Sequence, residues 1–148
     1  MFQFKRKQII PTDINTCWDF FSSPSNLKLI TPPYMGFDVK TIVPDSMYEG
    51  LIIAYTVKPL LGIPVEWVTE ITHINKGVFF VDEQRIGPYK LWHHEHHFKE
   101  VAEGVEMIDI VSYELPFGKL GKLVEPFLVS PKLKEIFDYR FKKVDELF

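Results

Sequence analysis

The sequence predicts an α+β fold in which a curved, seven-stranded antiparallel sheet wraps around a long C-terminal helix. The first observation is that hydrophobic residues alternate with a period of two from Gly36 to Pro116, which indicates strands. The second is that two short segments before residue 36 and the last thirty residues have helical spacing instead. The third is that short turn sequences join the strands, which favours antiparallel neighbours. Two short helices cannot cover such a sheet, so the C-terminal helix must lie on its concave face.

The elements before residue 36 are a strand and two short helices. The first ten residues alternate apolar and charged side chains and predict a strand. Asp13 can cap a helix with apolar residues at helical spacing, namely Ile14, Cys17, Trp18 and Phe21. Ser23 as cap and Pro24 at the first helical position predict a second short helix, which ends before Pro32.

Six further strands and the C-terminal helix follow. Turn residues place the strands at residues 37–43, 51–58, 65–74, 78–86, 91–102 and 105–115. The last apolar stripe of the C-terminal helix includes one charged residue, Arg140, among Leu133, Ile136, Phe137, Phe141, Val144 and Leu147. Pro126 and the Ser130-Pro131 pair interrupt the helical pattern, so we expect a break near residue 130.

Length and composition indicate one globular domain spanning residues 1–148. A chain of 148 residues can bury roughly 70% of its unfolded surface. Hydrophobic residues make up 46% of it, which is too many for a disordered protein. The 17 basic and 20 acidic residues create no positive field, so we expect no nucleic-acid partner. The chain also has 13 Phe, 6 Tyr and 3 Trp, and these rings must fill either a dense core or the wall of a cavity.

Three features lead us to expect a cytoplasmic protein. The single cysteine, Cys17, cannot form an internal disulfide, which fits a reducing compartment. The N-terminal residues lack the apolar region of a signal peptide. No apolar run approaches the roughly 20 residues that a transmembrane helix needs.

The loop lengths predict which side chains face inward. A two-residue loop at Glu103-Gly104 would pair Ala102 with Val105, and a four-residue loop at 87–90 would pair Ile86 with Leu91. This register places mostly apolar residues on one face: Trp67, Ile71, Phe79, Val81, Trp92, Phe98, Met107, Val111 and Leu115. The same face carries polar groups: Thr69, Glu83, Arg85, His94, His96, Asp109 and Tyr113. Burying ionisable groups unpaired costs several kcal/mol each, so they must be paired, hydrated or in contact with a ligand.

Four of the five histidines lie in the segment His93–His97, and on a strand only His94 and His96 face inward. The spacing of His94, His96 and Glu100 is similar to that of cupin metal ligands, but the glycine spacing differs and no later histidine follows. A hydrogen-bonded network of His94 or His96 with Glu83, Asp109 or Tyr113 is therefore favoured over a metal site.

Other polar and apolar features have two interpretations each. Glu83 and Arg85 could bind a carboxylate or act as acid and base, or they could form an ion pair at the sheet rim. Cys17 lies on an apolar stripe without a neighbouring base, which favours core packing over a nucleophilic role. The apolar loop 60–64 is expected to be exposed, either as a flap over a cavity mouth or as a homodimer contact.

Three segments together resemble the SRPBCC, or START-like, superfamily: GPYKLWHHEHHF at 87–98, DIVSYELPFG at 109–118 and IFDYR at 136–140. The similarity is greatest to its bacterial ligand-binding and polyketide cyclase/dehydratase-like members, and it covers nearly the whole chain. The resemblance implies a helix-grip fold, in which the sheet wraps the C-terminal helix around an apolar cavity. It also implies binding of lipids, sterols, polyketides or similar molecules, which some members transform and others only carry or sense.

We therefore expect the chain to bind a hydrophobic or amphipathic small molecule between the sheet and the C-terminal helix, without a cofactor. The expected wall residues are Trp67, Phe79, Trp92, Phe98, Tyr113, Phe137 and Phe141. The polar end of the ligand would meet Glu83, Arg85, His94 and His96, with Asp109 on the same face.

Three alternatives stay open. The first is a cyclase or dehydratase-type enzyme with His94 or Glu83 as general base and Arg85 stabilising an enolate. The second is a metal site on His94, His96 and Glu100. The third is a purely structural dimeric module.

Overall fold

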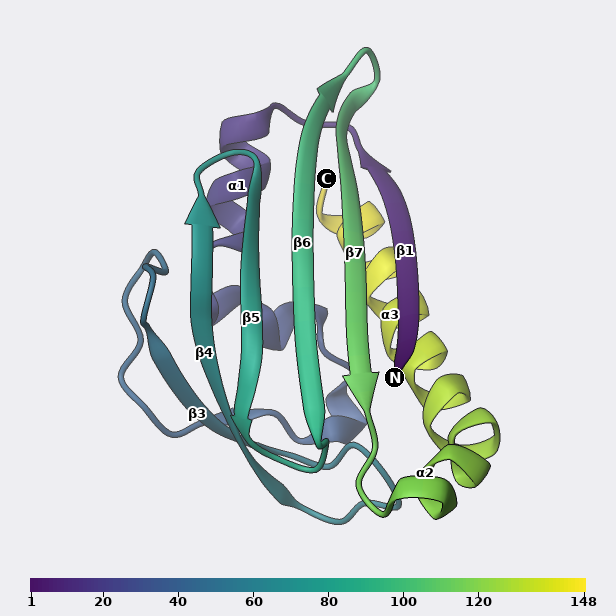
Figure 1. Cartoon of the computed structure of the whole chain (residues 1–148). Coiled ribbons are helices and arrows are strands. Elements are labelled where there is room, and N and C mark those ends of the chain that lie inside the picture. The colour runs from purple at the N-terminus through teal and green to yellow at the C-terminus, as the bar shows by residue number, and fades with distance from the viewer.

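The structure is a computed structural model that describes residues Met1–Phe148, and it confirms the predicted fold class (Figure 1). The seven strands are β1 (Phe2–Ile10), β2 (Asp38–Val39), β3 (Ile52–Val57), β4 (Val65–Asn75), β5 (Phe79–Ile86), β6 (Leu91–Val101) and β7 (Gly104–Glu114). The helical segments are α1 (Ile14–Phe21), the 3-10 helices η1 (Pro24–Ile30) and η2 (Pro33–Met35), α2 (Gly118–Val124), the π-helical η3 (Glu125–Val129) and α3 (Ser130–Leu147). None of these helices is long and apolar enough to cross a membrane.

All neighbouring strands are antiparallel, in the order β1-β7-β6-β5-β4-β3-β2. The first strand, β1, is an edge strand and pairs with the last strand, β7. Figure 1 shows all the helices on one face, with α3 behind β1 and β7 and α1 behind β4 and β5. The inner face of the sheet is hereafter the face that these helices cover.

The N-terminal helix begins as predicted, because the Asp13 carboxylate accepts hydrogen bonds from the backbone of Asn15 and Thr16 at 3.0 Å. Ser23 occupies the predicted N-cap position of the next helix, but its side chain makes no capping hydrogen bond. Pro24 does begin the next helix, but that helix is a 3-10 helix.

The strand expected at residues 37–43 is reduced to two residues, Asp38–Val39. Beyond Val39 only half of the ladder continues: Lys40 donates its backbone N–H to the carbonyl of Ala54 at 2.8 Å, but the Ala54 N–H donates to the hydroxyl of Thr41, at 3.2 Å, instead of to a carbonyl. A side chain thus replaces the ladder bond, and the following residues leave the sheet.

The break expected near residue 130 does not occur. Helical backbone continues through Val124, Glu125 and Ser130, which all have right-handed helical angles. The π-helical turn η3 separates α2 from α3, and its wider ring of hydrogen bonds accommodates Pro126, which has no N–H to donate. Helical backbone is therefore continuous from Gly118 to Leu147, but its direction changes between α2 and α3 (Figure 1), and α3 is the part that packs on the sheet.

The pairing of β6 with β7 differs from the prediction by two residues. Val101 pairs with Gly104, so the loop is Ala102-Glu103. A side chain at Gly104 would place its Cβ 2.1 Å from the carbonyl oxygen of Ile10, so the end of β1 requires glycine here. Because the shift is an even number of residues, every side chain of β6 and β7 keeps its predicted face.

The pairing of β5 with β6 differs by one residue, and this reverses the faces of β5. Asp82 pairs with His94, so Phe80 and Asp82 lie on the inner face and Glu83 on the outer face. The physical reason lies in Gln84, whose side-chain amide donates to the carbonyl of Tyr89 at 2.7 Å and accepts from its N–H at 3.1 Å. These two bonds hold the connection beyond Glu83 and His93, the last pair of the two strands, so Ile86 does not pair with Leu91 as predicted.

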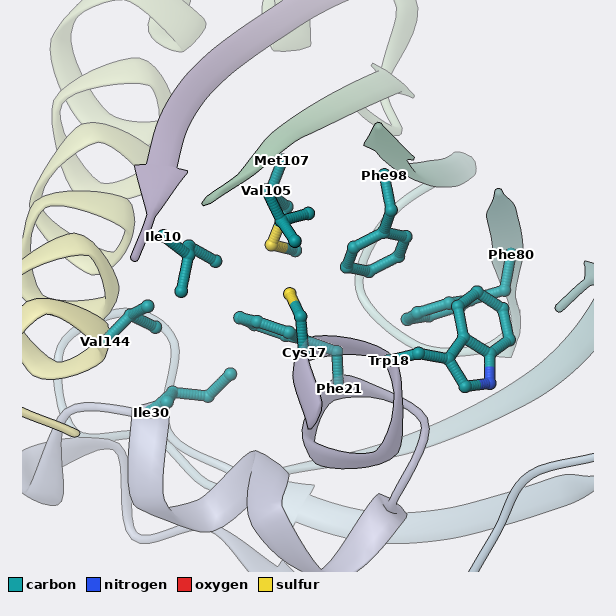
Figure 2. Packing of buried hydrophobic residues seen from close by; sticks show 10 residues of the cluster. All are labelled: Ile10, Cys17, Trp18, Phe21, Ile30, Phe80, Phe98, Val105, Met107 and Val144. Atoms are coloured by element: carbon teal, nitrogen blue, oxygen red, sulfur yellow. The ribbon is translucent and has the colours of Figure 1, made fainter. Parts of the chain in front are cut away.

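One end of the inner face is densely packed (Figure 2). Trp18 meets the rings of Phe80 and Phe98 edge to face, with centroids 5.9 and 5.5 Å apart. The side chain of Cys17 is fully buried and points toward Val105 and Met107. Cys17 is therefore a core residue, as predicted, and has no base beside it.

Candidate functional site

A cavity lies at the other end of the inner face, between the sheet and α3. The centre of a water molecule can reach about 170 Å³ of it, more than ten times the roughly 15 Å³ that one water needs. Hydrophobic side chains make up 18 of its 28 lining residues. They come from α1, η1, η2, β3, β4, β5, β6, α3 and the segments between them, so elements from both ends of the chain contribute to the wall.

Aromatic rings form the side of the cavity that lies against the sheet. Trp67 and Trp92 meet at right angles with centroids 5.3 Å apart, and Tyr55 stacks beside Trp67 at 6.2 Å. The hydroxyl of Thr69 accepts a hydrogen bond from Trp67 Nε1 at 3.1 Å and lies 3.3 Å from the Tyr55 hydroxyl. Because these polar atoms form hydrogen bonds with one another, this wall presents mainly carbon atoms to the cavity.

Four side chains form the polar part of the site, which we call the histidine–aspartate cluster: Asp82, His94, His96 and Asp109. The imidazole rings of His94 and His96 lie with their centroids 3.8 Å apart. His94 Nε2 donates to Asp109 Oδ1 at 2.9 Å, and His96 Nε2 donates to Asp82 Oδ2 at 2.8 Å. Both histidines are about 95% buried, and the cluster contains the His94–Asp109 bond favoured by the sequence.

Arg140, from α3, provides a positive charge beside this cluster. Its Nη1 atom is 4.0 Å from Asp109 Oδ1, and its guanidinium lies over the ring of Phe137 at 4.9 Å. Its Nε atom is buried and has no hydrogen-bond partner. Arg140 also lines the cavity, so it can reach a bound molecule.

The surroundings shift the pKa values of the two histidines in opposite directions. Burial and the charge of His96 hold the pKa of His94 below its ordinary value. Burial also disfavours charge on His96, but contacts with Asp109 and Asp82 raise its pKa above the ordinary value. Although burial opposes their ionisation, the two histidines hold the pKa values of both carboxyls below the usual range. His96 is thus protonated before His94, and with Arg140 that one proton makes the five groups neutral.

Five of the predicted site residues line the cavity: Trp67, Trp92, His94, His96 and Phe137. Three more are buried behind this wall. Phe98 lies in the packed cluster of Figure 2, and Asp109 lies behind the two histidines. The hydroxyl of Tyr113 donates a hydrogen bond to the buried carboxylate of Glu125.

Four of the predicted site residues do not line the cavity, and for three of them, Phe79, Glu83 and Arg85, the predicted inward face is wrong. Glu83 accepts a hydrogen bond from His93 Nδ1 at 2.8 Å, and Arg85 donates to Glu70 at 2.5 Å, all on the outer face. Phe79 lies beside His97, since the one-residue shift of β5 turned it outward. Phe141 lies under the guanidinium of Arg6, at 4.9 Å.

Glu100, the third residue of the metal alternative, is exposed. Asp82 lies in the place expected for Glu100, within 4.8 Å of the histidine nitrogens.

Sequence reasoning missed Asp82, Phe80 and Arg140. The local pattern gives no signal for Asp82 and Phe80, because their face depends on the Gln84 side chain. Arg140 did have a signal, since it is the charged residue in an otherwise apolar helical stripe.

Comparison with known proteins shows the fold. No family model matches the chain, and no curated protein does. Solved structures do match, and one is a protein from Arthrobacter aurescens with 13% identity, a TM-score of 0.73 and coverage of 97% of this chain and 86% of that one.

Protein Ms6760 from Mycobacterium smegmatis has 15% identity and a TM-score of 0.68, and the match covers 98% of this chain and 89% of that one. Major latex-like protein 151 from Panax ginseng has 11% identity and a TM-score of 0.67, and the match covers 98% of this chain and 95% of that one. Sequence identities this low show similarity of fold and nothing more. The chain therefore has the helix-grip fold that its resemblance to the SRPBCC superfamily implies.

Proposed function

We propose that this protein binds an apolar or amphipathic small molecule, such as a lipid or a polyketide, in the cavity between the sheet and α3. The observation that carries the proposal is the division of the cavity wall into two parts. Carbon-rich side chains surround most of the space, and the only ionisable cavity-lining groups besides Tyr55 and Tyr89 are Asp82, His94, His96 and Arg140. An apolar pocket with a few convergent polar groups is the usual composition of a small-molecule site.

The two parts of the wall have separate tasks in this proposal. The rings of Trp67 and Trp92 contact the apolar body of the ligand, where burial contributes about 25 cal/mol per Å² of apolar surface. The polar end of the ligand lies against Arg140 and the histidines. Arg140 lines the cavity, so its guanidinium can donate a hydrogen bond to an oxygen of the ligand.

The loop 60–64 borders the cavity, and we assign it the role of a flap rather than of a dimer contact. Pro59 lines the cavity, whereas Leu61 and Ile63 in the adjacent loop are exposed. Exposed apolar side chains beside an opening can close over a bound molecule. A homodimer through this loop would instead depend on protein concentration, and analytical ultracentrifugation separates the two roles.

Binding of 1-anilinonaphthalene-8-sulfonate tests the proposal, with fatty acids, sterols and aromatic polyketides as competitors. Ile136→Trp fills space in the cavity, and Ile42→Trp adds the same ring at a fully exposed position. We expect saturable binding of the dye, competition by at least one ligand class, and at least about tenfold weaker dye binding in Ile136→Trp alone. Equal affinity in both variants would place the dye outside the cavity and reject the proposal.

An acid–base enzyme of the cyclase or dehydratase type is the second candidate function. It is favoured by one observation: His94 lines the cavity while Asp109 holds its Nε2, which is the arrangement of an oriented general base. Its other two predicted residues, Glu83 and Arg85, lie outside the cavity. Comparing the products formed from a poly-β-keto substrate by the wild type and His94→Ala tests it, and unchanged products reject it.

A further inference from the structure

Three side chains of the histidine–aspartate cluster have the spacing of metal ligands. One ligand atom from each of Asp82, His94 and His96 lies within 4.8 Å of the other two. Asp82 Oδ2 is 2.8 Å from His96 Nε2 and 3.5 Å from His94 Nδ1. Neighbouring ligands of a tetrahedral Zn²⁺ ion are separated by about 3.3 Å, given bonds of about 2.0–2.1 Å. Small side-chain rotations are therefore enough to form such a site.

Asp109 contacts the opposite ring nitrogens of the same two histidines. Its Oδ1 atom accepts a hydrogen bond from His94 Nε2 at 2.9 Å and lies 3.0 Å from His96 Nδ1. The second contact is too poorly aligned for a hydrogen bond, so His96 Nδ1 is a buried polar atom without a partner. A carboxylate behind metal-binding histidines fixes their rings and makes the other nitrogen a better ligand.

The charges around the cluster also fit a cation. Arg140 lies 4.0 Å from Asp109 and offsets its charge. This leaves the carboxylate of Asp82 as the anionic ligand, together with two imidazoles. Two histidines, one carboxylate and an open position are typical of catalytic Zn²⁺ and non-haem Fe²⁺ sites.

We propose that Asp82 Oδ2, His94 Nδ1 and His96 Nε2 bind one divalent transition-metal ion of the Zn²⁺ type. All three side chains line the cavity, so the open coordination position faces the space where a small molecule binds. An oxygen of that molecule can then complete the coordination. The metal site does not depend on the proposed function, because it forms from three side chains of the protein alone.

Titration of chelator-treated, tag-free protein with Co²⁺, in the absence of any organic ligand, tests the proposal. We expect one Co²⁺ per chain, visible absorption bands of low-coordinate cobalt, and their loss when Zn²⁺ is added. Asp82→Asn should weaken Co²⁺ binding at least about a hundredfold, because it removes the anionic ligand. Asp109→Asn should weaken binding by about 10–100-fold, because it removes the group that orients the rings.

The same strand provides matched controls. His93 and His97 have the same chemistry but lie on the outer face with Glu83 and Glu95, and Glu100 is exposed. His93→Ala, His97→Ala and Glu100→Gln should each bind Co²⁺ within about twofold of the wild type. Loss of binding in the outer-face variants would overturn the proposal and place the metal on the surface.

NMR of the wild-type protein removes any dependence on how well the variants fold. Paramagnetic Co²⁺ should broaden the ring signals of His94 and His96 and leave those of His73, His93 and His97 sharp. If the wild type binds no stoichiometric Co²⁺, or if the outer histidines broaden first, the cluster is a hydrogen-bonded network only. Binding of the fluorescent dye in the cavity would be unaffected by that result, so the two proposals can fail separately.

Discussion

Strand β6 has four histidines, and its two faces place them in opposite surroundings. On the inner face, His94 and His96 are buried, stacked and held by two aspartates. On the outer face, His93 and His97 are 34% and 40% exposed and pair with Glu83 and Glu95. Neighbouring histidines on opposite faces thus interact with their carboxylate partners with different strength. The interaction is stronger on the inner face, because water cannot replace the carboxylate there.

Strand β5 shows the same contrast for carboxylates and rings. Asp82 and Phe80 face inward toward the histidines, while Glu83 and Phe79 face outward. In this sheet, the face on which a residue lies, and not its type, therefore decides whether it can contribute to the site. The following four experiments test the two faces against each other, beginning with the largest expected effect.

The reactivity of thiols should differ most between the faces. Burial raises the pKa of Cys17 to about 12, so its reactive thiolate is scarce at pH 8. In a Ser112→Cys variant, the new thiol lies on the outward-facing side of β7. We expect Cys17 to react with a disulfide reagent at least about a thousandfold more slowly than the new cysteine. Two equal labelling rates would show that the inner face opens readily.

Removing a ring should cost much more on the inner face of β5. Phe80 is 4% exposed and contacts Trp18, Phe98 and His96, so Phe80→Ala should lower the free energy of unfolding by about 3–5 kcal/mol. Phe79→Ala should lower it by about 1 kcal/mol or less, since Phe79 lies beside His97 on the outer face. Urea denaturation measures both values, and the reverse order would contradict the register of β5.

Histidine replacements should show the same order with a smaller difference. His96→Gln leaves a buried carboxylate without its full set of partners and should cost about 1.5–3 kcal/mol of unfolding free energy. His97→Gln removes an exposed pair with Glu95 and should cost about 0–1 kcal/mol. Equal costs in urea denaturation at pH 7 would mean that the cluster is hydrated.

The smallest effect is expected for Arg85, which the sequence placed in the site. Its guanidinium is 48% exposed and pairs with Glu70 and Glu83. Arg85→Ala should therefore change the unfolding free energy by about 0–1 kcal/mol and leave dye binding unchanged. Isothermal titration calorimetry with the dye checks the second part. A substantial loss of affinity for the dye would show that Arg85 contacts the bound molecule.

The sequence predicts most of the fold, because the period of hydrophobic residues is a local property that survives in the structure. Six of the seven strands and the inward faces of β6 and β7 follow from it, whereas the Asp13 cap follows from the polar residue before the helix. The break expected near residue 130 is absent, since a π-helical turn carries the helical backbone past Pro126 and such a turn leaves no simple pattern in the sequence.

The site was only partly predictable, because the face of β5 depends on one side chain. Gln84 bonds to the backbone of Tyr89, and the strands pair with Asp82 opposite His94, which brings Asp82 to the histidines in place of Glu83. Turn length was estimated from backbone signals alone, and these contain no information on such side-chain bonds. Arg140 was visible in the sequence, but its closeness to Asp109 requires the packing of α3 on the sheet.

An NMR titration with 1-anilinonaphthalene-8-sulfonate shows where on the protein a ligand binds. Binding in the cavity should shift the indole N–H signals of Trp67 and Trp92 and the ring signals of His94 and His96. The ring signals of His93 and His97 should stay in place. Shifts confined to the outer histidines or to exposed apolar residues such as Phe117 and Phe127, with the cavity signals unmoved, would contradict it.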